Sequence, residues 1–526
     1  MTVLSSKRFS RITLPLLSGF LLALSFPRPG LFPLAWIALI PLFVVIADQG
    51  PAKAFLSGWL VGLVYFGGTL YWIMLSLVRH GGLPWLISFL VLFLLVSYLA
   101  TYIGLFAALF RYAIADKKNA GLFVAPVLWV SLEWAKGRLL SGFPWAGLAY
   151  SQTSFLSMIQ MADFGGIYIV AFVVVLCNRA LYLGFTGNGG RAESPVHIRW
   201  QPLAAGCAVF LLGFFYGAFR LSESFEGSET KAQMTIAVIQ GNIPQDQKWD
   251  RRFQKQTLDT YRRLSTAAMR DSLRKHDLIV WPEAVLPFVF GTEAVQEQGL
   301  RDFAADKGVY LLFGAPSIGM SSPGKVSLRN SAYLLSPDSG QAAQQYNKLH
   351  LVPFGEYVPF PEFLFFIEKF VEGVADFAPG EDAVVFKVNQ ARVGTAICFE
   401  VIFPEIVRRF VQNGATVMTA ITNDAWFGRS AAPDQHFSMT VFRAIEHRIP
   451  FARAANTGIS GFIDARGRVM RETALFEEAT ATATLSLRQQ TTLYTRWGDF
   501  FAAFCAIISI SFLCMTWIKR RKKDAC

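Results

Sequence analysis

The stretch TAICFEVIFPE, residues 395–405, joins an apolar run to a carboxylate and carries one thiol, Cys398, at the junction. An apolar run that stops at a polar group predicts a buried strand that ends there. A sheet holds its strand ends rigidly, so a side chain that projects from one is well placed for chemistry. The stretch therefore predicts one strand of a sheet with Cys398 at its end.

The segment around this strand, from about 222 to 493, alternates short apolar runs with amphipathic stretches. Continuous Val, Ile and Leu runs are typical of strands buried on both faces, and alternation with helices indicates an α/β fold. The predicted strands are MTIAVIQ (234–240), DLIVWPE (277–283), VYLLFGAP (309–316), SAYLLSP (331–337), RVGTAICFE (392–400) and ATVMTAITND (415–424). The predicted helices cover 251–275, 292–306, 404–412 and 434–447.

Cys398 is the one thiol of this segment, although the chain has six cysteines. The others lie in hydrophobic stretches or in the final tail: Cys177, Cys207, Cys505, Cys514 and Cys526. A single thiol cannot form a disulfide within the segment, and the chain has no CxxC or Cys/His cluster. We expect no metal site. By itself, Cys398 fits a small buried hydrophobe as well as a nucleophile.

Composition places the rest of the chain in lipid. Of 526 residues, 53% are hydrophobic and 16% are charged, against about 25% charged residues in soluble domains. A helix that crosses a bilayer needs about 20 mostly apolar residues. We predict spans near 12–27, 31–47, 54–78, 85–110, 121–135, 165–186, 202–219 and 498–518. The first span has no A-x-A cleavage site, which favours an uncleaved anchor over a signal peptide.

The net charge of +12 indicates membrane orientation rather than nucleic-acid binding. Positive residues border apolar runs, as in KRRKKD (519–524), and no nucleic-acid-binding motif is present. Lys and Arg are more frequent at the termini and on alternate loops, which predicts that these are cytoplasmic. We predict an N-terminal membrane domain (1–221), an extracytoplasmic soluble domain (222–493), and a last span with a basic tail (494–526).

Three strand ends of the soluble segment carry groups that suit acyl transfer. Glu283 ends one apolar run, Cys398 ends another, and Lys348 comes just after a probable strand in GQAAQQYN. A thiol is a weak nucleophile until a base takes its proton, and an ammonium stabilises both a thiolate and a developing oxyanion. The histidines of this segment stand in no comparable setting. Taken singly, Glu283 and Lys348 are better explained as ordinary surface charges.

A family resemblance decides between these interpretations. WPEAVLP, NKLHLVPFGEYVPF and ICFE resemble the three signature blocks of the nitrilase (carbon–nitrogen hydrolase) superfamily, in the same order. The resemblance implies an αββα sandwich with a Glu-Lys-Cys triad. Such a domain between N-terminal helices and one C-terminal helix is similar to the apolipoprotein N-acyltransferases, as are QGNIPQDQKWD (240–250) and FPWAGLAYSQ (143–152). The expected fold is a polytopic α-helical membrane domain plus an α/β nitrilase-like sandwich.

The resemblance also implies roles for individual residues. Glu283 would be the general base, Lys348 the partner of the oxyanion and the thiolate, and Cys398 the nucleophile. Glu356 matches a second essential acid that supports this geometry. Three further positions match supporting or substrate-binding residues of the family: Glu400, Trp249 and Phe399. Phe399 stands where the family commonly has Tyr, so a role for that hydroxyl is not expected here.

The implied reaction is a two-step acyl transfer with no cofactor. A phospholipid, typically phosphatidylethanolamine, acylates the cysteine, and the α-amine of an S-diacylglyceryl cysteine in an apolipoprotein then accepts the chain. The implied location is the bacterial inner membrane, with the catalytic domain on the periplasmic side, and the default state is a monomer. The phenylalanine-rich stretch 359–380 is either a lipid-contacting lid or a packed helix. AWFG (425–428) is a second candidate lipid contact.

Two other functions stay open on the residues alone. A membrane-tethered amidase or nitrilase that uses water as acceptor would share the whole triad. A transporter or structural membrane protein with an inactive soluble domain would need charged residues inside its spans. Glu133 is the clearest candidate for such a charge, and the sequence shows no partner for it.

Overall fold

The computed structural model describes residues 2–114, 121–185, 198–223, 232–248, 250–271, 274–322, 325–338, 340–358, 377–487 and 490–524. The chain forms two compact units. The first, the helical unit, comprises 1–74, 85–223 and 496–526, and the second, the sandwich unit, comprises 75–84 and 224–495. Residues 75–84 therefore pack with the sandwich unit, although the sequence places them among the N-terminal helices.

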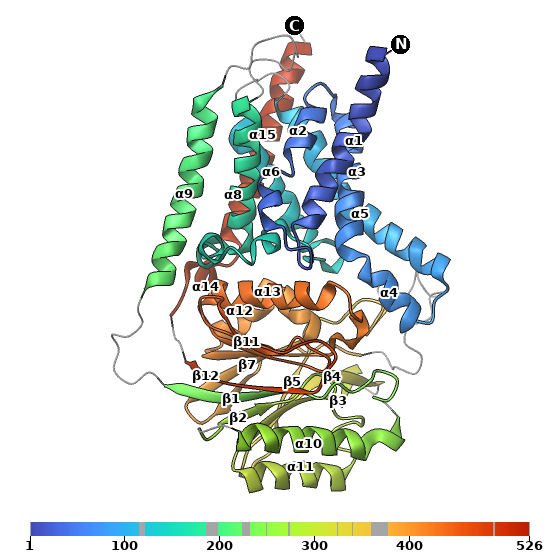
Figure 1. Ribbon diagram of the computed structural model, residues 1–526, viewed down its shortest axis with the longest axis vertical. Helices are drawn as coiled ribbons and strands as arrows, with labels where there is room; N and C mark the ends of the chain where they lie inside the picture. Colours follow the sequence, from blue (N-terminus) through green and yellow to red (C-terminus); the bar gives the residue numbers. More distant parts are fainter. Residues whose placement is uncertain are drawn as a thin grey trace. The chain divides into compact units, whose positions relative to one another are not determined.

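Helices build the first unit (Figure 1). Its main helices are α1 (Thr2–Leu24), α2 (Ile40–Ile46), α3 (Pro51–Leu70), α5 (Trp85–Ile114), α6 (Gly121–Lys136), α8 (Ala162–Phe185), α9 (Trp200–Ser222) and α15 (Phe500–Asp524). Within the described ranges, five of them are long and apolar enough to cross a membrane: α3, α5, α8, α9 and α15. The three spans that the sequence predicts to be short correspond to shorter apolar helices near α1 and α2 and to α6.

The predicted span 54–78 is wrong at its C-terminal end. Helix α3 stops at Leu70, and a separate helix, α4 (Trp72–Arg79), runs from the helical unit into the sandwich unit. The apolar run misled the prediction because the residues from Trp72 to Val78 belong to α4, and those from Leu75 onward pack with the sandwich unit. Ser76, in this run, donates a hydrogen bond to the backbone oxygen of Trp426 at 2.7 Å, within the sandwich unit.

Close packing of small residues joins α3 to α5. A Cβ on Gly62 would lie 2.5 Å from the Cα of Ala100, and a Cβ on Gly58 would lie 2.5 Å from the backbone oxygen of Ile103. Small residues four apart let two helix backbones approach, which is how helices associate in lipid. Large apolar side chains on other faces are exposed, among them Leu212 and Phe215 on α9. This pattern fits a bundle surrounded by lipid tails.

Glu133 has partners in the structure. Its Oε1 accepts a hydrogen bond from the backbone N–H of Leu148 at 2.7 Å. One turn along α6, the ammonium of Lys136 donates to the backbone oxygen of Trp145 at 2.9 Å. Both charged groups thus hold the FPWAGLAYSQ loop (143–152), and this structural use accounts for Glu133 without a transport path.

Two six-stranded sheets form the centre of the second unit. The first has the order β12-β1-β2-β3-β4-β5 and the second β11-β10-β9-β8-β7-β6. The strands of the first are β1 (Gln233–Gln240), β2 (Leu278–Val280), β3 (Tyr310–Ser322), β4 (Lys325–Leu335), β5 (Gln344–Asn347) and β12 (Ala479–Ser486). Those of the second are β6 (Val385–Val388), β7 (Ala391–Ile397), β8 (Val417–Thr422), β9 (Phe451–Ala455), β10 (Gly461–Ile463) and β11 (Val469–Glu472).

Helices cover the outer faces of the two sheets (Figure 1). Helices α10 (Gln254–Arg270) and α11 (Ala294–Lys307) lie on the first sheet, and α12 (Pro404–Gln412) and α13 (Ala432–His447) lie on the second. Strands β1, β2 and β3 are parallel, as are β7, β8 and β9. Parallel strands covered on both faces are apolar throughout, which is why these were predictable. The predicted αββα sandwich is confirmed.

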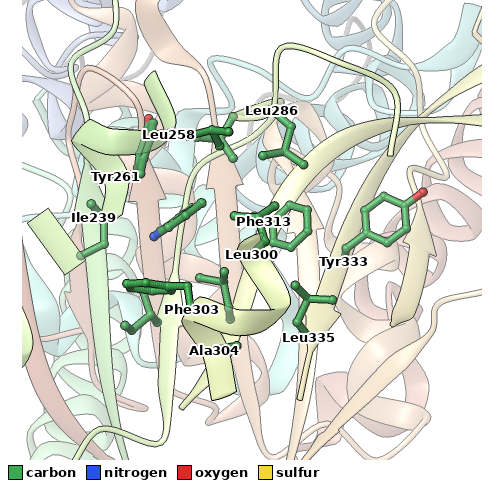
Figure 2. Close-up of a cluster of buried hydrophobic side chains, with 14 of the residues drawn as sticks. Ile239, Leu258, Tyr261, Leu286, Leu300, Phe303, Ala304, Phe313, Tyr333 and Leu335 are labelled. Carbon is green, nitrogen blue, oxygen red and sulfur yellow. The ribbon is translucent and has the colours of Figure 1, made fainter. Parts of the chain in front are cut away.

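A buried cluster fixes α10 and α11 to the first sheet (Figure 2). Trp281 lies at its centre, fully buried, and its indole N–H donates to the hydroxyl of Ser265 on α10 at 2.8 Å. Leu258, Phe303 and Phe313 belong to the same cluster. Removing a buried Trp side chain typically costs about 3–5 kcal/mol. Because Trp281 is two residues before Glu283, the same packing anchors that candidate site residue.

Candidate active site

The three predicted catalytic side chains all lie at strand ends. Glu283 comes after β2, Lys348 comes directly after β5, and Cys398 comes directly after β7. Strands β2 and β5 belong to the first sheet and β7 to the second, so the groups come from both layers of the sandwich. Glu283 is 7% and Lys348 1% exposed, whereas Cys398 is partly accessible.

Lys348 lies between two carboxylates. Its Nζ is 2.9 Å from Oε1 of Glu356 and 3.5 Å from Oε1 of Glu283. The amide of Asn330 joins the same two carboxylates, donating to Glu283 at 2.8 Å and to Glu356 at 2.7 Å. The second oxygen of Glu283 accepts from the backbone N–H of Asn423 at 3.0 Å. These contacts hold Glu283 and Lys348 in one buried, hydrogen-bonded cluster.

The backbone of Cys398 adopts a conformation that non-glycine residues rarely take. Its φ is 51°, in the left-handed region, which costs of order 1–3 kcal/mol and is common at functional sites. The ring of His436 holds this conformation, with its Nε2 donating to the backbone oxygen of Cys398 at 3.1 Å. Nδ1 of His436 lies 3.1 Å from Asp424, which also pairs with Arg453 at 2.7 Å. This fully buried cluster of His436, Asp424 and Arg453 contacts the backbone of Cys398 through His436.

Glu400 connects the cysteine loop to the lysine loop. One carboxylate oxygen accepts from the hydroxyl of Tyr346 and from the backbone N–H of Leu349, both at 2.6 Å. The other oxygen accepts from the backbone N–H of Ile397 at 2.7 Å. Burial raises the pKa of Glu400 to about 7, and these donors oppose the rise because they favour the carboxylate. Glu400 therefore fixes the two loops relative to each other.

Of the remaining predicted site residues, the structure describes Phe399 but not Trp249. Phe399 is buried and packs edge-on against Phe403, with ring centroids 5.1 Å apart, and against His350 at 5.9 Å. This is the aromatic packing that a Phe retains in place of Tyr. Trp249 lies outside the described residues, as do residues 359–376 of the candidate lid over 359–380.

Electrostatics keep the thiol protonated at rest and the lysine charged. Burial raises the pKa of the Cys398 thiol, and the charge of Glu283 raises it further, while Lys348 opposes both. For Lys348, burial acts to lower the pKa, but the carboxylates of Glu356 and Glu283 outweigh it and leave the pKa above its ordinary value. The site thus combines a neutral thiol, an adjacent carboxylate and a permanent ammonium.

Comparison with known proteins identifies the family. Residues 18–180 match the family model described as the apolipoprotein N-acyltransferase N-terminal domain, and residues 235–493 match that of the carbon-nitrogen hydrolases. A protein named apolipoprotein N-acyltransferase from Geobacter metallireducens is 42% identical over 492 residues, covering 93% of this chain and 92% of its own length. The chain belongs to the apolipoprotein N-acyltransferase family.

A second relative agrees with this assignment, and similar solved structures are also found. An apolipoprotein N-acyltransferase from Photobacterium profundum is 30% identical and covers 99% of this chain and 98% of its own. Among solved structures, Saccharomyces cerevisiae Nit3, of the nitrilase superfamily, is 18% identical with a TM-score of 0.39, covering 49% of this chain and 92% of its own. The predicted family and acyltransferase class are confirmed, and the acyltransferase is favoured over the hydrolase. With its apolar helices, this family member is a multi-pass membrane protein.

Sequence reasoning missed several residues that surround the candidate triad. Asn330 lies in the middle of β4, just before the predicted strand 331–337, and an amide there gives no sign of its direction. Lys248 lies within the quoted stretch QGNIPQDQKWD, yet nothing in its neighbourhood marks it as buried. His436 lies mid-helix, and its contact with Cys398 spans 38 positions of the chain. Each of these residues reaches the site through contacts with distant parts of the chain, which the neighbouring sequence does not indicate.

Proposed function

We propose that this chain transfers an acyl chain from a membrane phospholipid to the α-amine of an S-diacylglyceryl cysteine at the N-terminus of an apolipoprotein. The observation that supports this most directly is the buried Glu283–Lys348 pair at strand ends, whose charges act on the thiol of Cys398. The family to which the chain belongs supplies the substrate class. Glu283 is the general base, Cys398 the nucleophile and Lys348 the electrophilic partner in this proposal.

In the first step, Cys398 takes the acyl chain from the lipid. Glu283 accepts the thiol proton while the sulfur attacks the ester carbonyl, and the ammonium of Lys348 stabilises the oxyanion that forms. The C–O bond to glycerol breaks, and Glu283 returns the proton to the leaving alkoxide. The products are a thioester on Cys398 and a lysophospholipid. Glu356 and Asn330 keep the base and the ammonium in register throughout.

In the second step, a neutral amine attacks the thioester. Glu283 accepts the amine proton as the C–N bond forms, the C–S bond breaks, and the same proton returns to the sulfur. An ammonium has no free electron pair, so the acceptor must lose its first proton before it attacks. Water has to be excluded in the interval between the steps, since hydrolysis would release free fatty acid.

The setting of the reaction follows from the two lipid substrates. Both are confined to the membrane, so a catalytic domain tethered by apolar helices has to search only the bilayer surface. We propose phosphatidylethanolamine as the donor, the bacterial inner membrane as the location, the periplasmic side for the catalytic domain, and a monomer as the active state. Positive residues at the chain ends and on alternate loops support this orientation.

The deciding experiment isolates the first step. The detergent-purified chain is incubated with phosphatidylethanolamine and no acceptor, and the mass of the Cys398 peptide is measured. We expect a hydroxylamine-sensitive acyl adduct that is absent in Cys398→Ala and weakened in Glu283→Gln. Lysolipid with free fatty acid and no adduct would favour the hydrolase. The absence of both products from folded protein would overturn the proposal.

A further inference from the structure

A second lysine is buried beside the Glu283–Lys348 pair and has no part in the steps above. Lys248 is 4% exposed, and its Nζ donates to the backbone oxygen of Glu283 at 3.1 Å. It comes from the loop after β1, whereas Lys348 follows β5, which lies on the other side of β2 at one edge of the sheet. Two ammonium groups thus approach the same glutamate from different sides, one at its carboxylate and one at its backbone.

The turn that Lys248 contacts is a strained one. Ala284, the next residue, has a φ of 46°, in the left-handed region that alanine rarely adopts. The hydrogen bond from Lys248 engages the carbonyl that directly precedes this residue. A charged donor makes a stronger hydrogen bond than a neutral one, and it is suited to hold a turn that would otherwise relax. The direction of the Glu283 side chain depends on this turn.

Charge balance gives Lys248 a second effect. Glu283 and Glu356 carry two negative charges against the single positive charge of Lys348, which leaves the buried cluster at −1. Lys248 brings the cluster to neutrality. When Glu283 takes the proton of Cys398, the charge moves to sulfur and the cluster stays neutral, whereas without Lys248 the thiolate would form beside a net negative charge. Asp424 also acts on Cys398, but it is paired with Arg453 at 2.7 Å.

We propose that Lys248 is a positioning residue of this active site, which fixes the Glu283 turn and balances the charge of the thiolate on Cys398. The inference rests on the proposed roles of Glu283 and Cys398. The electrostatics agree with it, since Lys248 interacts with both groups while burial lowers its pKa to about 8. A buried ammonium without a charge to balance would be costly to keep, and here the charge is supplied by the catalytic carboxylates.

The test measures the reactivity of Cys398 without any lipid. The full chain in detergent is alkylated with iodoacetamide between pH 6 and 10, and the rate is followed on the Cys398 peptide by mass. We expect Lys248→Met to alkylate about tenfold more slowly at neutral pH, equivalent to a rise of one unit in the thiol pKa. Lys248→Arg, which keeps the charge, should restore the wild-type profile. Lys255→Met removes the same charge from the exposed start of α10 and should change nothing.

Each result separates this inference from the proposed function. A wild-type pH profile in folded Lys248→Met would overturn the role of Lys248 alone. Failure of both Lys248→Met and Lys248→Gln to fold would assign the lysine to stability and would also overturn it. If Glu283→Gln leaves the alkylation profile of Cys398 unchanged, the proposed base is wrong, and the fault lies with the proposed function instead.

Discussion

At the residue scale, the site depends on backbone conformations that are individually unfavourable. Cys398, Ala284 and Phe354 all have positive φ, and each belongs to a different one of the three sequence blocks that carry the site. Such residues persist only where their surroundings hold them. His436 holds Cys398, Glu400 ties its loop to the lysine loop, and Lys248 engages the turn before Ala284. The reactive groups are thus set by neighbours that do not react.

His350, which lies two residues after Lys348, makes the stability of the folded chain sensitive to acid. Its ring packs on Phe403 at 3.9 Å, and burial, aided by the charge of Lys348, lowers its pKa from 6.5 to about 4. Between pH 6.5 and 4 the unfolded chain binds a proton that the folded chain does not, so stability falls as pH falls through this window. We expect His350→Phe, which keeps the ring, to lose less thermal stability than wild type between pH 7 and 5. Equal losses in the two proteins would contradict this.

The three candidate catalytic residues could be found from the sequence, but the residues that hold them in place could not. Glu283 and Cys398 each end an apolar run, and a strand end is visible in a sequence as the point where such a run stops. Lys348 follows the polar stretch QAAQQYN, and the resemblance to the family block marked it. Asn330 and His436 act from the middle of a strand and a helix. Their contacts reach 47 and 38 positions along the chain, so no local pattern records them.

At the element scale, β3 supports the base through a residue with no side chain. A Cβ on Gly314 would lie 2.5 Å from the backbone N of Ala284 and 2.7 Å from the Cα of Glu283. The two segments are also joined by backbone hydrogen bonds, from Gly314 N to Pro282 O and from Val285 N to Gly314 O. The strand and the turn are therefore in direct backbone contact, which leaves no room for any other residue at 314.

This contact predicts the effect of one methyl group. Gly314→Ala should push the Glu283 turn away from β3, and a displacement near 1 Å at a catalytic group costs about 100-fold in rate. Acyl transfer by the purified variant measures the loss. Gly319→Ala on the same strand is the control, because the atoms nearest its Cβ belong to the flexible side chain of Arg329. Comparable activity in the two variants would show that the turn tolerates displacement.

The element pattern was predictable for most of the buried strands. Strands β1, β2, β3, β7 and β8 each overlap a predicted run because both their faces are covered. Strand β9 is equally buried but was missed, because FARAA combines alanines with an arginine and is not an apolar run. The edge strands were missed for opposite reasons. Every residue of β11 is exposed, and β12 alternates Ala and Thr with a single large apolar residue, Leu485. Such edges are specified by the strands they pair with rather than by their own hydrophobicity.

At the scale of the whole molecule, the chain passes between its two units four times, at 74/75, 84/85, 223/224 and 495/496. Within the helical unit, α3 and α5 approach each other closely at their glycines. A Cβ on Gly62 would meet the backbone of Ala100, whereas a Cβ on Gly67, also on α3, would meet nothing within 4 Å. The same helix thus offers a sensitive position and a neutral one.

We expect Gly62→Ala to destabilise the helical unit and Gly67→Ala to leave it unchanged or more stable. Overpacking typically costs about 1–3 kcal/mol, while alanine in an unhindered helix position is favoured over glycine. Thermal loss of helical circular dichroism in detergent measures both effects. If the two variants melt together, the α3–α5 contact does not limit the stability of this unit.

The ten residues 75–84 also constrain how the chain threads the membrane. They share one compact unit with 224–495, so both segments lie on the same side of the bilayer. The chain between them must then cross an even number of times. Helices α5, α8 and α9 are long and apolar enough for three crossings, and we expect α6, with only 16 residues, to supply the fourth. Helix α6 is too short to be chosen as a membrane span by its length, but an even number of crossings between 84 and 224 requires it.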